Sequence, residues 1–136
     1  MDELVRLGVA ALLGGVIVAA ACGARALYFR RLAGHAEAPA DDLLARYDLP
    51  AGEPGILYFA GERCVQCVAL QEPALKRLAS VHPVNIRKLD AVGEPDITRR
   101  FNILTVPATV VIGADQRIRS VNVGFADERT LLQQLA

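Results

Sequence analysis

The chain contains 136 residues, of which 15 are basic, 15 are acidic and 53% are hydrophobic. A formal net charge of zero argues against a nucleic-acid-binding protein, because such proteins ordinarily carry a basic excess. Three cysteines are too few for a secreted mini-protein held together by disulfides, and a charged fraction of 22% excludes general disorder. The length fits one small domain with an additional segment.

The additional segment is an uncharged, apolar stretch near the N-terminus, from Leu7 to Ala24. As a helix this stretch rises roughly 27 Å, close to the roughly 30 Å hydrocarbon core of a bilayer. Residues 28–31 (YFRR) are aromatic and then basic, which is typical of the interface between membrane and water. We therefore predict a single transmembrane helix over residues 4–29.

Two other interpretations of this segment stay open. A cleaved signal peptide is disfavoured because the opening sequence MDELVR holds two acids and one arginine. A lipoprotein signal would end at Cys22, since AAAC loosely resembles a lipidation site, but an acidic start and an arginine-rich continuation argue against it. Otherwise Cys22 is a small apolar residue in a helix.

The arginines beside the span predict its orientation. Arg6 precedes the span, whereas Arg25, Arg30 and Arg31 lie at its C-terminal end. Because basic residues are enriched on the cytoplasmic side of a membrane, the C-terminal domain is expected in the cytoplasm, at the cell membrane. The alternative is an extracytoplasmic domain.

Residues 30–54 contain several glycines and prolines and are predicted to be a juxtamembrane linker, with a short helix from Asp41 through Tyr47. From residue 55 onward, the hydrophobic pattern predicts the order βαβαββα, which fits one thin sheet covered by helices. The predicted elements are strands at 55–60, 84–89, 108–112 and 117–123, and helices at 64–80, 95–101 and 127–135. Pro73 lies inside the first of these helices and is expected to kink it.

Two cysteines form a Cys-x-x-Cys pair, Cys64-Val65-Gln66-Cys67, between a predicted buried strand and a predicted helix. The N-terminus of a helix presents unpaired N–H groups and a partial positive charge, which favour a thiolate at the outer cysteine. A thiolate is the nucleophile of disulfide exchange. Cys64 is therefore expected to attack, and Cys67, one turn further on, to resolve.

A Cys-x-x-Cys pair is also half of a tetrahedral zinc site. The chain has no second such pair, and its other cysteine and histidine ligands are Cys22, His35 and His82. We expect no metal, and no cofactor besides the redox-active disulfide Cys64–Cys67 itself. Two core cysteines without chemistry are the remaining alternative.

Four motifs in chain order resemble the thioredoxin family. They are GILYFAGERCVQC at residues 55–67, Lys88-Leu89-Asp90, Thr105-Val106-Pro107-Ala108-Thr109, and VNVGFADERTLLQQL at 121–135. The resemblance covers about residues 55–136 and implies an α/β, thioredoxin-like fold, in which a central mixed sheet of about four strands is flanked by helices. The first strand of the complete fold is not evident, so we expect a shortened version.

The resemblance also implies roles for individual residues. Cys64 would be the nucleophile and Cys67 the resolving thiol. Pro107 would be a cis-proline packed beside the disulfide, and Val106 would offer backbone groups to an extended substrate segment.

The sequence departs from the family at several positions. Arg63 precedes the first cysteine, where thioredoxins commonly have Trp, and its positive charge favours the thiolate. Tyr58 stands where many thioredoxins bury an acid that helps to deprotonate the resolving thiol, whereas Lys88, that acid's usual neighbour, is retained. Pro73 lies slightly further along the helix than the family's kink proline. The base for Cys67 is therefore not evident.

These features predict a membrane-tethered thiol–disulfide oxidoreductase that acts as a protein-disulfide reductase. Its expected partners are protein disulfide substrates, a dithiol electron donor and the membrane, with no nucleic acid. The alternative is a redox-inactive, thioredoxin-like protein-binding module at the membrane, because the buried acid and the Trp are missing.

Overall fold

The structure, a computed structural model of the chain, describes residues 1–33 and 38–136. The chain divides into two compact units, Met1–Ala33 and Gly34–Ala136. His35, weighed above as a zinc ligand, lies outside the described residues, as does the part of the predicted linker at 34–37.

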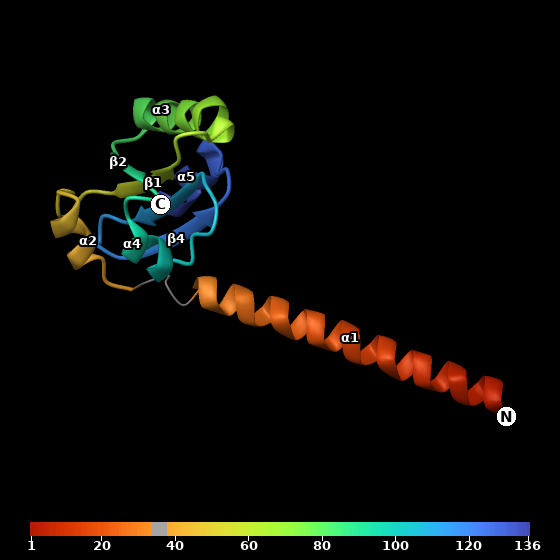
Figure 1. Cartoon of the computed structure of the whole chain (residues 1–136). Coiled ribbons are helices and arrows are strands. Elements are labelled where there is room, and N and C mark those ends of the chain that lie inside the picture. Colours follow the sequence, from red (N-terminus) through yellow and green to blue (C-terminus); the bar gives the residue numbers. More distant parts are fainter. Residues whose placement is uncertain (34–37) are drawn as a thin grey trace. The chain divides into compact units, whose positions relative to one another are not determined.

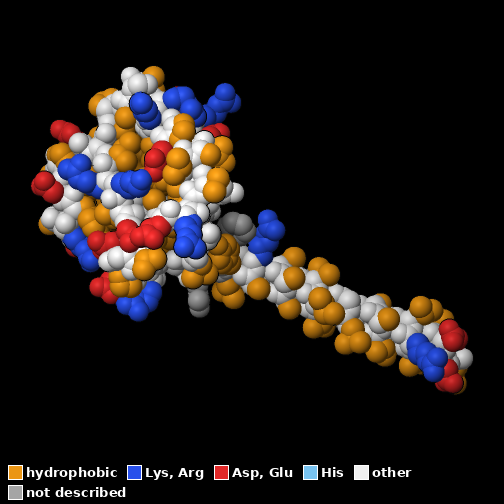
Figure 2. All heavy atoms as spheres, turned by 45° about the horizontal axis from the view of Figure 1, so that its top comes forward, with side chains coloured by type: hydrophobic (Ala, Val, Ile, Leu, Met, Phe, Trp, Pro, Cys, Tyr) orange, Lys and Arg blue, Asp and Glu red, His pale blue; other side chains and the backbone are white. Residues whose placement is uncertain are grey.

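The first unit is one helix, α1, over Asp2–Ala33 (Figure 1). Its segment Asp2–Tyr28 has a mean hydropathy of 2.2 in its most apolar window, and none of that window is buried. Hydrophobic side chains follow one another along the face of the helix that Figure 2 shows, with charged side chains at its N-terminal end. By length and composition α1 is thus able to cross a membrane, and it includes the predicted span 4–29.

The second unit is built on a mixed four-stranded sheet with the order β2-β1-β3-β4. β1 is parallel to β2 and antiparallel to β3, and β3 forms an antiparallel hairpin with β4. This architecture confirms the predicted fold class. The bounds are α2 Asp41–Arg46, β1 Gly55–Ala60, η1 Cys67–Gln71, α3 Glu72–Val81, β2 Asn85–Asp90, α4 Pro95–Arg100, β3 Ala108–Ile112, β4 Ile118–Val123 and α5 Glu128–Leu135.

Every residue of the central strand β1 is buried, because helices cover both faces of the sheet. Alternate residues of a strand point to opposite faces, so Leu57 and Phe59 join one hydrophobic cluster and Ile56 and Tyr58 the other. The first cluster packs against α2 and α4, and the second against α3 and α5 (Figure 1). Together these clusters make a three-layered core with β1 at its centre.

The segment expected as a linker is in part a component of the folded unit, which corrects the predicted boundary at residue 55. Ala40, Leu43 and Leu44 are buried in the core. The Ala40 N–H donates to the carbonyl of Gln116 at 3.0 Å, and the Ile118 N–H donates to the carbonyl of Ala38 at 3.0 Å. The short helix predicted from Asp41 is confirmed as α2. The domain therefore begins well before β1.

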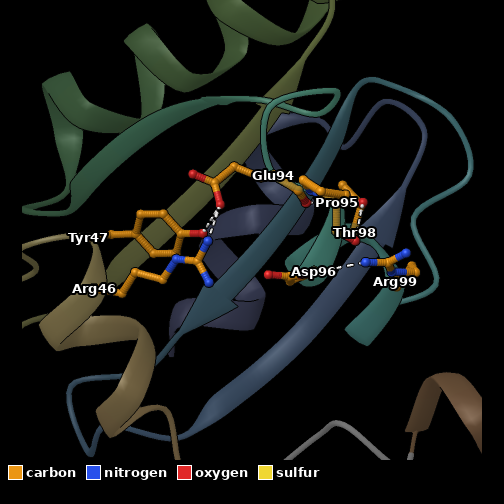
Figure 3. Close-up of polar contacts among 7 residues, drawn as sticks. All are labelled: Arg46, Tyr47, Glu94, Pro95, Asp96, Thr98 and Arg99. Carbon is orange, nitrogen blue, oxygen red and sulfur yellow. Dashed lines mark hydrogen bonds and ion pairs between the residues drawn. The ribbon is translucent and has the colours of Figure 1, made fainter.

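Glu94, at the start of α4, fastens α2 to the rest of the domain (Figure 3). Its Oε2 accepts hydrogen bonds from Arg46 Nη2 at 2.6 Å and from the Tyr47 hydroxyl at 2.8 Å. Burial, together with the hydrogen bond to Glu94 and the charge of that carboxylate, raises the pKa of Tyr47 to about 12, so the phenol remains a donor at neutral pH. Figure 3 also shows Asp96 bound to Arg99 within α4 itself.

The helix that follows Cys64 changes from α-helical to π-helical hydrogen bonding before Pro73. It begins directly after Cys64, passes through a wide π-turn, η1, and continues as α3. In this turn the Glu72 N–H donates to the carbonyl of Cys67, five residues back, rather than four as in an α-helix. A proline lacks the N–H of an α-helical bond and its ring clashes with the preceding turn, so a wider turn here accommodates it.

Candidate functional site: a cysteine pair at a helix N-terminus

The two cysteines lie at the junction between the end of β1 and the start of the helix that follows it. The Cys64 N–H donates to the carbonyl of Gly61 at 3.3 Å, and the Val68 N–H donates to the carbonyl of Cys64 at 3.4 Å, which closes the first helical turn. Cys64 and Cys67 form a disulfide, with their Cα atoms 5.2 Å apart. A short reactive loop is thus held between a fully buried strand and a helix.

The two sulfurs have unequal surroundings. Cys67 is 1% exposed and belongs to the core cluster on the α3 side of the sheet, whereas Cys64 is only partly buried. The Cys67 N–H donates to Cys64 Sγ at 3.1 Å. After reduction this donor, with the positive end of the helix, would stabilise a thiolate at Cys64. The more accessible sulfur is thus also the one that would be stabilised as a thiolate after reduction.

A second loop contributes Val106 and Pro107 beside the cysteine loop. The Val106–Pro107 peptide bond is cis, as the family resemblance implies. A Cβ placed on Gly61 would approach Val106 Cγ2 to 3.2 Å, so the two loops are in close contact. The Pro107 carbonyl accepts the N–H of Gly124 at 2.8 Å, and Gly124 has a φ of 101°, a conformation that favours glycine. The structure thus places Val106 against Gly61, and Val106 and Cys64 both pack against the core cluster that contains Cys67.

Tyr58 and Lys88 both contact the carboxylate of Glu72, on the Cys67 side of the site. The Lys88 Nζ lies 2.6 Å from Glu72 Oε1, and the Tyr58 hydroxyl donates to the same oxygen at 3.4 Å, which is long for such a bond. Burial and the neighbouring Glu72 carboxylate raise the pKa of Tyr58 to about 12, so this residue stays a neutral phenol at physiological pH.

An open cavity of about 410 Å³ is lined by Cys67, Glu72 and Lys88, among other residues. Cys67 lines it from the helix, and Glu72 and Lys88 line it on either side of their ion pair. A separate hollow is lined by Cys64, by its neighbours Arg63 and Val65, and by residues of η1. Arg63 is exposed and lines this hollow together with Cys64, and its electrostatic role stays a prediction.

The side chain of Gln71 joins the π-turn to the segment before α5 through two hydrogen bonds. Its side chain is 0% exposed, its Nε2 donates to the Ala126 carbonyl at 3.0 Å, and its Oε1 accepts the Ala126 N–H at 3.0 Å. One amide side chain thus satisfies both backbone groups of a buried residue.

Glu72 and Gln71 were not predicted from the sequence. The one signal that pointed to them was the displaced Pro73, because an extra residue between Cys67 and the proline is what a π-turn contains. Among residues 1–33 and 38–136, no group of three or more His, Cys, Asp or Glu side chains could hold a metal ion.

Comparison with known proteins supports the fold. The chain is similar to a thioredoxin pre-protein from Schistosoma mansoni, with a TM-score of 0.58 and 17% identity over 72% of this chain and 93% of that one. It is also similar to a mutant thioredoxin from Halobacterium salinarum, with a TM-score of 0.57 and 22% identity over 71% of this chain and 83% of that one. The likeness to MTB DsbF has a TM-score of 0.50 and 19% identity, over 62% of this chain and 80% of that one.

The mixed four-stranded sheet and the likeness to these solved structures show that the second unit has a thioredoxin-like fold. No model of a protein family matches the sequence. A search of curated proteins finds no match either.

Proposed function

We propose that the protein is a membrane-tethered thiol–disulfide oxidoreductase. The observation that carries this proposal is the unequal cysteine pair: an accessible Cys64 whose sulfur accepts an N–H at 3.1 Å, backed by a Cys67 that is 1% exposed. In the reduced protein, the Cys64 thiolate attacks a substrate disulfide, a mixed disulfide forms and one substrate thiol leaves. Cys67 then attacks Cys64 Sγ, which releases the second substrate thiol and leaves the Cys64–Cys67 disulfide.

The neighbouring loop suits an extended substrate segment. Val106 precedes β3, which pairs with β1 next to the cysteine loop, and its backbone is the group proposed to meet the substrate. Protein disulfides are the proposed substrates, and a dithiol protein is the proposed electron donor that returns the pair to its reduced form.

Mixed-disulfide trapping tests the assignment. With the full chain in detergent, Cys67→Ser is expected to accumulate a covalent complex with insulin, because the attacking thiol remains and the resolving thiol is gone. The complex is measured by non-reducing electrophoresis and mass spectrometry. Cys64→Ser is the matched control and should form no complex. A complex of equal yield with Cys64→Ser would contradict the assigned roles.

The proposed anchor is α1, with the thioredoxin-like unit in the cytoplasm, as the arginines at its C-terminal end suggest. The uncleaved chain should stay in the membrane fraction after alkaline carbonate extraction. In cells that carry the Cys22→Ala, Cys67→Ser double variant, an impermeant maleimide should label Cys64 only after permeabilisation. Labelling of intact cells would place the domain on the other side of the membrane.

A further inference from the structure

Resolution of the mixed disulfide requires a group that accepts the proton of Cys67. Cys67 must lose its proton before it can attack, yet it is 1% exposed, and burial disfavours the charged form of a thiol. The polar side chain that β1 contributes nearby is the Tyr58 phenol, which stays protonated at neutral pH. A base must therefore come from another element.

Glu72 is placed to supply that base because of the π-turn. Its backbone N–H is bonded to the carbonyl of Cys67, so the two residues are one turn apart and share a face of the helix. Both line the cavity of about 410 Å³. A water molecule occupies roughly 30 Å³ in the liquid, so this cavity has room for water between the thiol and the carboxylate.

Lys88 fixes the carboxylate of Glu72 in this position. Lys88 Nζ and the Tyr58 hydroxyl both contact Oε1, at 2.6 and 3.4 Å. Both of these contacts are to Oε1, and Oε2 is the oxygen proposed to take the proton. The ammonium of Lys88 also faces the cavity, where it would favour a transient thiolate.

Two other carboxylates, Glu62 and Asp90, line the same cavity. Both belong to exposed residues, and Asp90 Oδ1 already accepts the N–H of Val92 at 3.2 Å. The Glu72 side chain is 36% exposed, is held by an ion pair and is tied to Cys67 through the backbone. These contacts distinguish Glu72 from the other two.

Building on the proposed function, we infer that Glu72 is the proton acceptor for Cys67 during resolution of the mixed disulfide. The Cys67 proton passes through water in the cavity to the Glu72 carboxylate. The Cys67 thiolate attacks Cys64 Sγ, the Cys64–Cys67 bond forms, and the bond between Cys64 and the substrate sulfur breaks. The departing substrate thiolate takes up a proton, and Glu72 returns its own to the solvent, so two electrons and two protons reach the substrate over the full reaction.

Single-turnover mixing with dithio-bis-nitrobenzoate separates the two steps in the full chain carrying Cys22→Ala. The first equivalent of coloured thiolate reports the attack by Cys64, and the second reports resolution by Cys67. Because general base catalysis commonly contributes about a hundredfold or more, Glu72→Gln should slow the second phase about a hundredfold at pH 6–7 and leave the first unchanged. The deficit should shrink as pH rises, because hydroxide then deprotonates Cys67 directly.

Glu128→Gln is the matched control. Glu128 is an α5 carboxylate of similar exposure, 35%, with an ion pair to Arg77 at 3.1 Å, and its loss should leave both phases unchanged. Equal second phases in Glu72→Gln and Glu128→Gln at every pH would overturn the inference, as would a slow second phase found in Glu62→Gln or Asp90→Asn instead. If the chain with intact Glu72 released no second equivalent, the proposed function itself would fail.

Discussion

Reduced Cys64 is expected to react with iodoacetamide about ten to a hundred times faster at pH 6 than an unstructured peptide thiol does. The thiolate is the reactive form, and the Cys67 N–H at 3.1 Å donates to the Cys64 sulfur. A hydrogen bond to a charged group contributes about 1.5–3 kcal/mol, which corresponds to about a ten- to hundredfold larger thiolate fraction. The rate is measured by mass spectrometry of the labelled peptide, with the full chain in detergent.

The same protein provides its own control for this measurement. Unfolding in urea removes the helix and the N–H donor but keeps the chemical neighbours of Cys64, including Arg63, so the reaction should slow to the peptide rate. Cys67 should remain unlabelled in the folded protein because it is 1% exposed. Equal rates at Cys64 before and after unfolding would refute electrostatic activation.

Replacement of Gln71 by Leu is expected to lower the free energy of unfolding by about 2–6 kcal/mol. Leu fills a similar volume but leaves both the N–H and the carbonyl of Ala126 without their partners in a residue that is 5% exposed. Each buried polar group left unsatisfied costs about 1–3 kcal/mol. Urea unfolding of the full chain, followed by circular dichroism, measures the difference.

Gln133→Leu is the control for this substitution. Gln133 is exposed on α5, and exposed substitutions away from special features usually change stability by less than about 0.5 kcal/mol. A loss in Gln71→Leu no larger than that in Gln133→Leu would show that the paired hydrogen bonds to Ala126 contribute little.

The sheet was the most predictable part of the structure. The strands predicted at Gly55–Ala60 and Ala108–Ile112 are observed at those residues, as β1 and β3. Both are short apolar runs rich in strand-forming residues and bordered by glycine or proline, which is the local pattern of a buried strand. The two other strands each begin one residue later than predicted, within the usual uncertainty of element ends.

The packing of the segment before β1 was the least predictable part. Its glycines and prolines indicate turns, and they do not predict that Leu43 and Leu44 are buried in the core. That burial depends on contacts with residues far along the chain, such as the pairing of Ala38 with Ile118 and of Tyr47 with Glu94. Local periodicity carries no information about such partners.

Within the candidate site, the cysteines and the Val106–Pro107 loop were predictable because their types and order are distinctive. Glu72 was not, because a regular helix advances about 100° per residue and would turn the fifth residue after Cys67 well away from it. The π-turn cancels most of that rotation. The additional residue in the π-turn thus brings Glu72 onto the same face of the helix as Cys67.

The π-turn also constrains how the length of this chain can change in evolution. Five residues of a π-turn span about the same rotation as four residues of an α-helix, so loss of one residue between Cys67 and Gln71 would let the segment return to α-helical spacing with little rotation of the parts on either side. The cysteine pair, the hydrogen bonds of Gln71 to Ala126 and the carboxylate of Glu72 would then keep their relative directions. Loss of one residue within residues 68–70 is therefore expected to be tolerated, whereas a further insertion there would rotate the cysteine pair relative to α3.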